Sequence, residues 1–126
     1  MAADANLVLQ ASVTKVANFN STGVGLPTGT PRRGLVARVI HSATGLATST
    51  GTVTFSIEHG DTLGGTYYLL SSAADDVITL SATAQAGEIF IPFQTERAFV
   101  RLVCTFGGSP GTPTTTYFGD IVLAHP

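Results

Sequence analysis

The stretch from Arg97 to Phe106 constrains the fold of this chain more than any other feature. Side chains of a β-strand point alternately to opposite faces of the sheet, so a strand with one buried face shows a period of two. One face would carry Ala98, Val100, Leu102, Cys104 and Phe106, and the other Arg97, Phe99, Arg101, Val103 and Thr105. The following Gly-Gly-Ser-Pro breaks the run. We therefore expect a long strand with a core face and a mixed surface face.

Other segments share this strand-like character. Residues 52–59 alternate most regularly, and Pro92 marks residues 88–93 as an edge or irregular strand because proline cannot donate a ladder hydrogen bond. The remaining strand-like runs are residues 6–12, 13–19, 34–41, 66–70, 77–80 and 117–124. No window of ten or more residues has the three-and-four apolar spacing of an amphipathic helix. The pattern predicts an all-β protein.

About eight short strands in 126 residues are typical of an antiparallel β-sandwich of jelly-roll type. A seven-stranded immunoglobulin-like sandwich is the alternative, disfavoured because the chain has no tryptophan and one cysteine. We expect a single domain, residues 1–126, with an N-terminal arm at 1–12 and a long loop at 20–33 that could reach a neighbour. Glycines of the turn at 59–65 are expected to supply positive φ.

Composition narrows the possible partners. Only 11% of the residues are charged, the net charge is −2 and there is a single lysine, which disfavours nucleic acid and anionic membranes as partners. No stretch approaches the roughly 20 apolar residues of a membrane span. The N-terminus lacks the basic start and apolar run of a signal peptide, so we expect the chain to stay in the compartment where it is made.

The chain offers no recognisable catalytic or metal-binding set. His41, His59 and His125 lack the spacing of known metal motifs and are interpreted as surface or strand-end residues. Acidic pairs such as Asp75 and Asp76 adjoin turn residues, where aspartate commonly bonds its own backbone. Cys104 falls on the apolar face of its strand and is expected to be buried. The prediction is a protein that is not an enzyme, with no cofactor and no metal.

Arginines and aromatic residues are the best candidates for contact with a partner. Arginine is enriched and lysine depleted at protein interfaces, and a guanidinium can both stack and fork onto carboxylates. The predicted interface residues are Arg32, Arg33, Tyr67, Tyr68, Phe99 and Arg101. A sugar-stacking platform at Tyr67 and Tyr68 is an alternative interpretation of the two tyrosines.

Several segments together carry a family resemblance. They are a short N-terminal strand, Gly-Leu-Val-Ala-Arg-Val at 34–39, Thr-Phe-Ser-Ile-Glu-His-Gly-Asp at 54–61, Thr-Glu-Arg-Ala-Phe-Val-Arg-Leu at 95–102 and Phe-Gly-Asp-Ile-Val-Leu-Ala at 118–124. In this order the chain resembles the jelly-roll cement, or head-decoration, proteins of tailed bacteriophages.

The resemblance implies a structural virion protein, made in the host cytoplasm, that binds the major capsid protein on the outside of the phage head and stabilises the shell. It also implies a homotrimer. Binding only to assembled shell would stabilise it by mass action, and three linked copies gain effective concentration. Two alternatives stay open at this point: a carbohydrate-binding or adhesive β-sandwich module, and a tail-tube or connector subunit.

Overall fold

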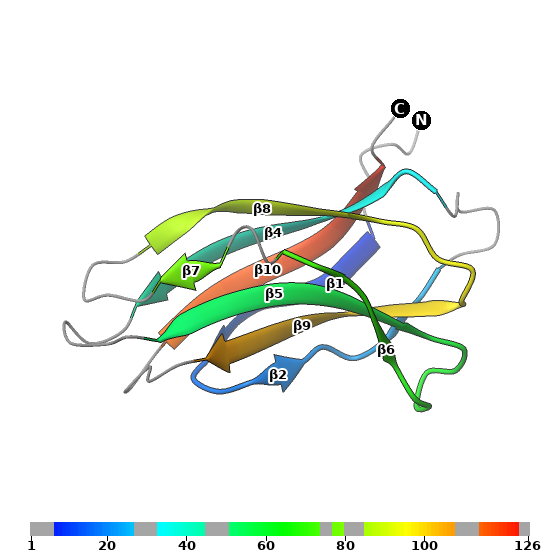
Figure 1. Ribbon diagram of the computed structural model, residues 1–126, viewed down its shortest axis with the longest axis horizontal. Helices are drawn as coiled ribbons and strands as arrows, with labels where there is room; N and C mark the ends of the chain where they lie inside the picture. Colours follow the sequence, from blue (N-terminus) through cyan, green and yellow to red (C-terminus); the bar gives the residue numbers. More distant parts are fainter. Residues whose placement is uncertain are drawn as a thin grey trace.

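The computed structural model describes residues 7–26, 33–44, 51–73, 77–79, 85–107 and 114–123, which form two packed β-sheets (Figure 1). Sheet A has the strand order β1-β10-β4-β8, and sheet B has the order β2-β9-β5-β6, with β3 also paired to β9 and β7 to β5. The strands of sheet A are β1 (Leu7–Lys15), β10 (Thr114–Leu123), β4 (Leu35–Thr44) and β8 (Gln85–Phe93). Those of sheet B are β2 (Phe19–Asn20), β3 (Val24–Gly25), β9 (Phe99–Gly107), β5 (Thr52–Gly60), β6 (Tyr68–Ser72) and β7 (Ile78–Thr79).

Strand pairing is antiparallel throughout and nested along the chain. β5 pairs with β6, β4 with β8, β2 with β9 and β1 with β10, so that each pair encloses the one before it. Successive pairs alternate between the two sheets, which is the arrangement of a jelly roll. The ten segments occupy eight positions because β2 and β3 share one edge of β9, while β6 and β7 share one edge of β5. The predicted all-β jelly-roll sandwich is confirmed.

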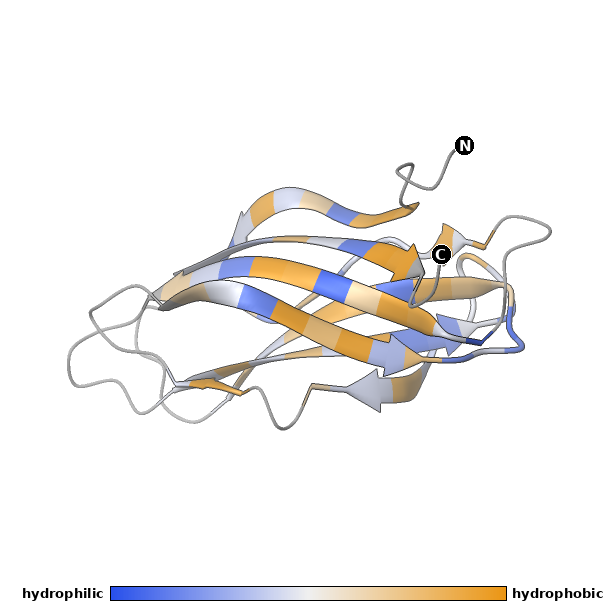
Figure 2. Ribbon diagram, turned by 90° about the horizontal axis from the view of Figure 1, so that it is seen from above, coloured by the Kyte–Doolittle hydropathy of each residue, from blue (hydrophilic) through white to orange (hydrophobic). Residues whose placement is uncertain are grey.

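The core lies between the sheets, where alternate side chains of each strand meet. From sheet B, the predicted inward residues Val100, Leu102 and Cys104 are fully buried, together with Val53, Phe55 and Ile57. Sheet A contributes Leu35, Ala37, Val39, Ile89, Ile91 and Tyr117. In Figure 2 hydrophobic orange dominates the strands and hydrophilic blue positions are isolated. Ala98 precedes β9 and is exposed, since the strand begins at Phe99.

The edge position predicted from Pro92 is confirmed, because β8 is the last strand of sheet A. Pro92 lies opposite Val36 of β4, and its carbonyl oxygen accepts a hydrogen bond from Ser71 Oγ at 3.0 Å. Ser71 belongs to β6, the edge strand of sheet B. A side-chain bond therefore joins the two sheets along this side of the sandwich.

The strand predicted at 6–12 is confirmed from residue 7, because residues 7–12, which also belong to the expected N-terminal arm, form the first part of β1. Residues 20–26 of the expected loop lie along β9 through β2 and β3. These two-residue strands were not predicted, because they are held by tertiary pairing rather than by a local pattern. Residues 1–6 and 27–32 lie outside the described part of the chain.

The expected positive φ in the turn at 59–65 is wrong. Among the described residues Gly34 alone has a positive φ, 69°, where the chain enters β4. At Gly60 the backbone of Thr66 passes close by instead, since a Cβ on Gly60 would lie 2.7 Å from the Thr66 carbonyl oxygen. Glycine is needed at position 60 because there is no room for a side chain, and not because the backbone is left-handed.

Candidate contact surfaces

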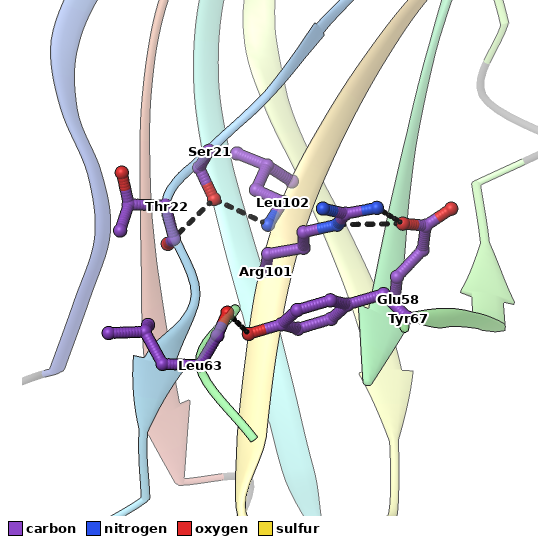
Figure 3. A network of polar contacts seen from close by, with 7 residues as sticks. All are labelled: Ser21, Thr22, Glu58, Leu63, Tyr67, Arg101 and Leu102. Atoms are coloured by element: carbon purple, nitrogen blue, oxygen red, sulfur yellow. Dashed lines mark hydrogen bonds and ion pairs between the residues drawn. The ribbon is translucent and has the colours of Figure 1, made fainter. Parts of the chain in front are cut away.

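The outer face of sheet B carries a compact polar cluster built from β5, β9 and the loop before β6 (Figure 3). Arg101 of β9 bonds Glu58 of β5 through both Nε and Nη2, at 2.8 and 2.6 Å, and the two residues are direct cross-strand partners. The Arg101 guanidinium also lies 4.3 Å from the centre of the Tyr67 ring. A stacked, paired guanidinium of this kind is held in one orientation. Arg101 is therefore engaged within its own chain.

Tyr67 lies across β9 and reaches the segment between β2 and β3. Its hydroxyl donates a hydrogen bond to the Leu63 carbonyl oxygen at 3.0 Å. Beside it, Ser21 bonds Leu102 in both directions, donating its backbone N–H to the carbonyl oxygen at 2.8 Å and accepting the Leu102 N–H on Oγ at 2.9 Å. Gly23 leaves room for the tyrosine, since a Cβ there would overlap the Tyr67 hydroxyl.

The substitution Gly23→Ala is expected to lower the free energy of unfolding by about 1 kcal/mol, the typical value of one lost hydrogen bond. The new methyl group forces the Tyr67 hydroxyl away from Leu63. Denaturant titration measures the loss, with Tyr67→Phe as the matched control that removes the same hydrogen bond without adding a methyl group. If Gly23→Ala is neutral while Tyr67→Phe is not, the steric argument is wrong.

A second arginine lies at the end of the same sheet. Arg97 pairs with Asp61 at 2.7 Å, and its guanidinium carbon lies 5.0 Å from the centre of the Tyr68 ring. Asp61 is largely exposed, so this pair adds little to stability. Register places Tyr68 opposite His59, whereas Leu69 lies opposite Glu58, so Tyr68 belongs to the other side of the strand from the Tyr67 cluster. The two tyrosines do not form one flat platform.

His59 is held beside Arg97 by the buried Thr95. Its Nδ1 lies 2.7 Å from Thr95 Oγ1, which also accepts the backbone N–H of Arg97 at 3.0 Å. Partial burial, and then the positive charge of Arg97, lower the pKa of His59, while Asp61 opposes the shift. The folded protein thus favours the neutral imidazole.

We expect this shift to make stability fall in mild acid. The unfolded chain takes up a proton on His59 as the pH drops below about 6.5, whereas the folded chain resists it until a lower pH. Stability is therefore complete above the ordinary pKa and decreases as the pH falls through the lowered one. Melting temperatures of wild type and His59→Gln between pH 7.5 and 5 should converge toward the acid end. Parallel curves would contradict the assignment.

The outer face of sheet A carries exposed apolar side chains on β1, β4 and β8, beside the charged residues Arg38, Glu88 and Asp120. Val8, Ile40 and Phe90 are between 43% and 52% exposed. Half-buried side chains fill the space between them, and cross-strand register makes the surface continuous, pairing Ile40 with Phe118 and Val36 with both Val122 and Pro92. We call this surface the sheet A face: Val8, Val36, Ile40, Phe90, Pro92, Phe118 and Val122. Contiguous apolar surface of this kind is typical of an interaction site.

An ion pair lies at the centre of the sheet A face. Arg38 Nε and Nη2 bond the two carboxylate oxygens of Asp120 at 3.0 and 2.7 Å. Although Asp120 is on the solvent side of the sheet, its side chain is only 3% exposed, and the hydrogen bond to it raises the pKa of Arg38. The pair leaves the centre of this face without net charge, and the exposed Glu88, the register partner of Ile40 on β8, adds one carboxylate beside the apolar side chains.

The sequence-predicted contact residues are dispersed. Tyr67 and Arg101 meet in one cluster, Tyr68 packs near Arg97, and Phe99 is half-buried against Gly25. Arg33 is exposed just before β4, and Arg32 lies outside the described residues. The sheet A face was missed, although its signal was visible in the nearly continuous apolar run at 34–41. A strand that is apolar on both faces indicates a covered outer face.

Two further reactive side chains that the structure describes, His41 and Cys104, are buried, whereas His125 lies outside the described residues. His41, interpreted from sequence as a surface or strand-end residue, lies inside β4 with its ring 6.0 Å from that of Phe55. The prediction that Cys104 is buried is confirmed, and burial raises the pKa of its thiol to about 12. Within the described ranges no three His, Cys, Asp or Glu side chains gather as a metal site. Those ranges also hold no helix with the length and hydropathy to cross a membrane.

Comparison with known proteins gives similarity of fold alone. No family model and no curated protein match the sequence. A solved structure described as "CBM4 structure and function" is 18% identical, covers 80% of this chain and 56% of its own, and has a TM-score of 0.46. A protein of Bacillus endospore appendages, described as a novel family of disulfide-linked pili, is 13% identical, with coverages of 94% and 89% and a TM-score of 0.36. Similarity this low carries no argument about function, and the protein is described as a β-sandwich module.

Proposed function

We propose that this protein is a non-catalytic structural component of a tailed-bacteriophage virion that binds the outside of the assembled head and stabilises it. The proposal includes a homotrimer, contact with the major capsid protein and synthesis in the host cytoplasm. The observation that carries it is the sheet A face, an apolar surface on a chain with 11% charged residues. The sequence resemblance to cement proteins supplies the identity of the partner.

Physical reasons support contact through this face. Ile40 and Phe90 expose large apolar side chains to water, and burial of such groups against a partner is favourable at about 25 cal/mol per Å². The Arg38–Asp120 pair is already satisfied within the chain, so neither of its groups needs a charge from the partner, whereas the exposed Glu88 next to Ile40 would have to face a polar group of the partner or stay in contact with water. A protein that binds only the assembled shell shifts the equilibrium toward the shell.

The geometry of the two tyrosines disfavours the carbohydrate-binding alternative. A stacked sugar needs an open aromatic face, but Arg101 covers one face of Tyr67 and the hydroxyl is bonded to Leu63. Tyr68, which is exposed, lies on the other side of β6. Tyr67 and Tyr68 thus do not present a shared platform for a sugar ring.

The test is binding to purified phage heads from which the decorating protein has been removed. Ile40→Glu and Phe90→Glu place a charge in the sheet A face and are expected to weaken binding about thirtyfold, the equivalent of about 2 kcal/mol at an interface hot spot. Leu69→Glu is the matched control, because Leu69 is a 65% exposed apolar residue on sheet B. Co-sedimentation measures binding, and circular dichroism verifies that each variant is folded.

The outcomes separate the proposal from its alternatives. Equal binding by wild type, Ile40→Glu and Leu69→Glu would exclude the sheet A face as the contact. No binding of the wild type to heads would contradict the proposed function itself. Open polymers of the purified chain under the electron microscope would favour the tail-tube or connector alternative. Arg33→Glu and Arg101→Gln in the same assay test the contact residues predicted from sequence.

A further inference from the structure

Residues 7–26 supply the outermost strand of both sheets along one side of the sandwich. β1 ends sheet A on β10, and β2 with β3 end sheet B on β9. In Figure 1 these are the blue segments, next to the orange-red β10 and the brown-yellow β9. Every other described strand follows in the sequence, so one connection, at residues 27–32, links this segment to them. We call residues 7–26 the edge segment.

The edge segment is paired less regularly with the rest of the fold than the other strands are with one another. The register between β1 and β10 shifts twice, between Val8 and Gln10 and between Gln10 and Val13. Leu9, 4% exposed, is the one buried residue of β1, and β2 and β3 offer two paired residues each. Leu26 also belongs to the core, and Leu7, Val13 and Val24 pack against it. Between them Ser21 uses its side chain to bond Leu102. Irregular pairing at the outer edge of both sheets makes this segment easier to release than the strands beneath it, although its apolar side chains reach the core.

The strands beneath the edge segment are long and regular. β10 pairs with β4 over ten consecutive residues, and β9 pairs with β5 over nine, without a shift. If the edge segment leaves, both strands expose unpaired N–H and C=O groups, and such an edge readily takes up another strand. A segment that replaces it has to pair with the edges of both β10 and β9, and the part that pairs with β9 has to be interrupted at the position of Ser21.

We propose that the edge segment exchanges between copies of this chain, so that residues 7–26 of one copy pair with β9 and β10 of another. A second copy carries the segment with the right sequence, and an exchanged segment re-forms the same contacts, which makes such exchange a low-cost route to oligomers. Charge does not oppose it, because the edge segment contains a single charged residue, Lys15. This inference does not depend on the proposed function.

The experiment uses Thr14 of β1 and Thr116 of β10, which are register partners with their hydroxyl oxygens 2.8 Å apart. Thr14→Cys and Thr116→Cys chains carrying tags of different length are mixed, unfolded, refolded together under reducing conditions and then oxidised with copper phenanthroline. Both positions are exposed, and thermal unfolding verifies each variant. A disulfide between the two kinds of chain forms readily only if one chain's β1 lies on the other chain's β10.

The control is a mixture of Thr14→Cys with Thr79→Cys, whose exposed side chain lies on β7 at the other side of the sandwich. Paired thiols react at effective concentrations on the order of millimolar, so at roughly ten micromolar protein we expect about a hundredfold more mixed disulfide than in the control. The product should elute as an oligomer in size exclusion. Mixed disulfide at the control level, with each chain eluting as a closed monomer, would overturn the inference.

Discussion

Replacing Arg38 by alanine is expected to lower the free energy of unfolding by about 3 kcal/mol, at the lower end of the cost of breaking a buried ion pair. The lower end applies because Arg38 is itself 31% exposed, whereas Asp120 is 3% exposed and would lose both charge-assisted hydrogen bonds from Arg38. Guanidinium chloride titration at pH 7 measures the change.

Two further variants isolate the cause. Arg97→Ala removes a surface ion pair and should cost about 0–1 kcal/mol, since Asp61 is mostly solvated. The double variant Arg38→Met with Asp120→Leu should be close to wild type, because apolar residues of similar volume often replace a buried pair without loss. Equal losses from Arg38→Ala and Arg97→Ala would show that the Asp120 site is wetter than its geometry indicates.

The substitution Phe55→Ala is expected to have the largest effect on stability, about 3–5 kcal/mol. Phe55 is fully buried on β5, its ring meets that of Tyr117 edge-on at 5.0 Å, and the ring of His41 is 6.0 Å away. Removing it leaves a cavity between the sheets. For a domain of this size the loss corresponds to a decrease in melting temperature of about 15 °C.

Phe90→Ala is the matched control for Phe55→Ala, since it removes the same ring from the outer face of sheet A, where it is 52% exposed. Its cost should be about 1 kcal/mol or less. Calorimetry compares the two variants directly. A similar cost at both positions would mean that the sheet A face is covered in the isolated protein.

The sequence predicted those strands in which one face is core and the other is not. In β5, Val53 and Phe55 are fully buried on the inner face. The same burial that stabilises the strand therefore produces the alternation of apolar and polar residues in the sequence. Pro92 predicted an edge for the equally local reason that it lacks a donor. The jelly-roll class followed from the number and spacing of such runs. Which strand pairs with which was known only from the structure.

What the sequence did not predict depends on distant partners. β2 and β3 are too short for any periodicity, and their path is set by Ser21 and Leu102, which are 81 residues apart. His41 is buried because β4 turns that side chain toward Phe55, and nothing local to His41 indicates it. The sheet A face arises only when Ile40, Phe90 and Phe118 are brought onto one surface by register.

The interface residues expected from composition illustrate a further limit. Arg101 and Tyr67 were chosen because arginine and tyrosine are common at interfaces, and they do lie together on an outer face. Their chemistry is largely satisfied by Glu58 and Leu63 within the chain. Residue type predicted the kind of contact that Arg101 and Tyr67 make. It did not predict whether the contacting group belongs to the same chain or to a partner protein.

The pairing of β1 with β10 has a consequence for synthesis. A ribosome releases residues 7–15 well before residues 114–123, so β1 has no partner strand until β10 has been synthesised. Throughout translation the growing polypeptide holds an unmatched apolar strand, a state in which nascent chains on one messenger could meet. A truncated product that stops before residue 114 would lack β10 and leave β1 permanently without its partner strand.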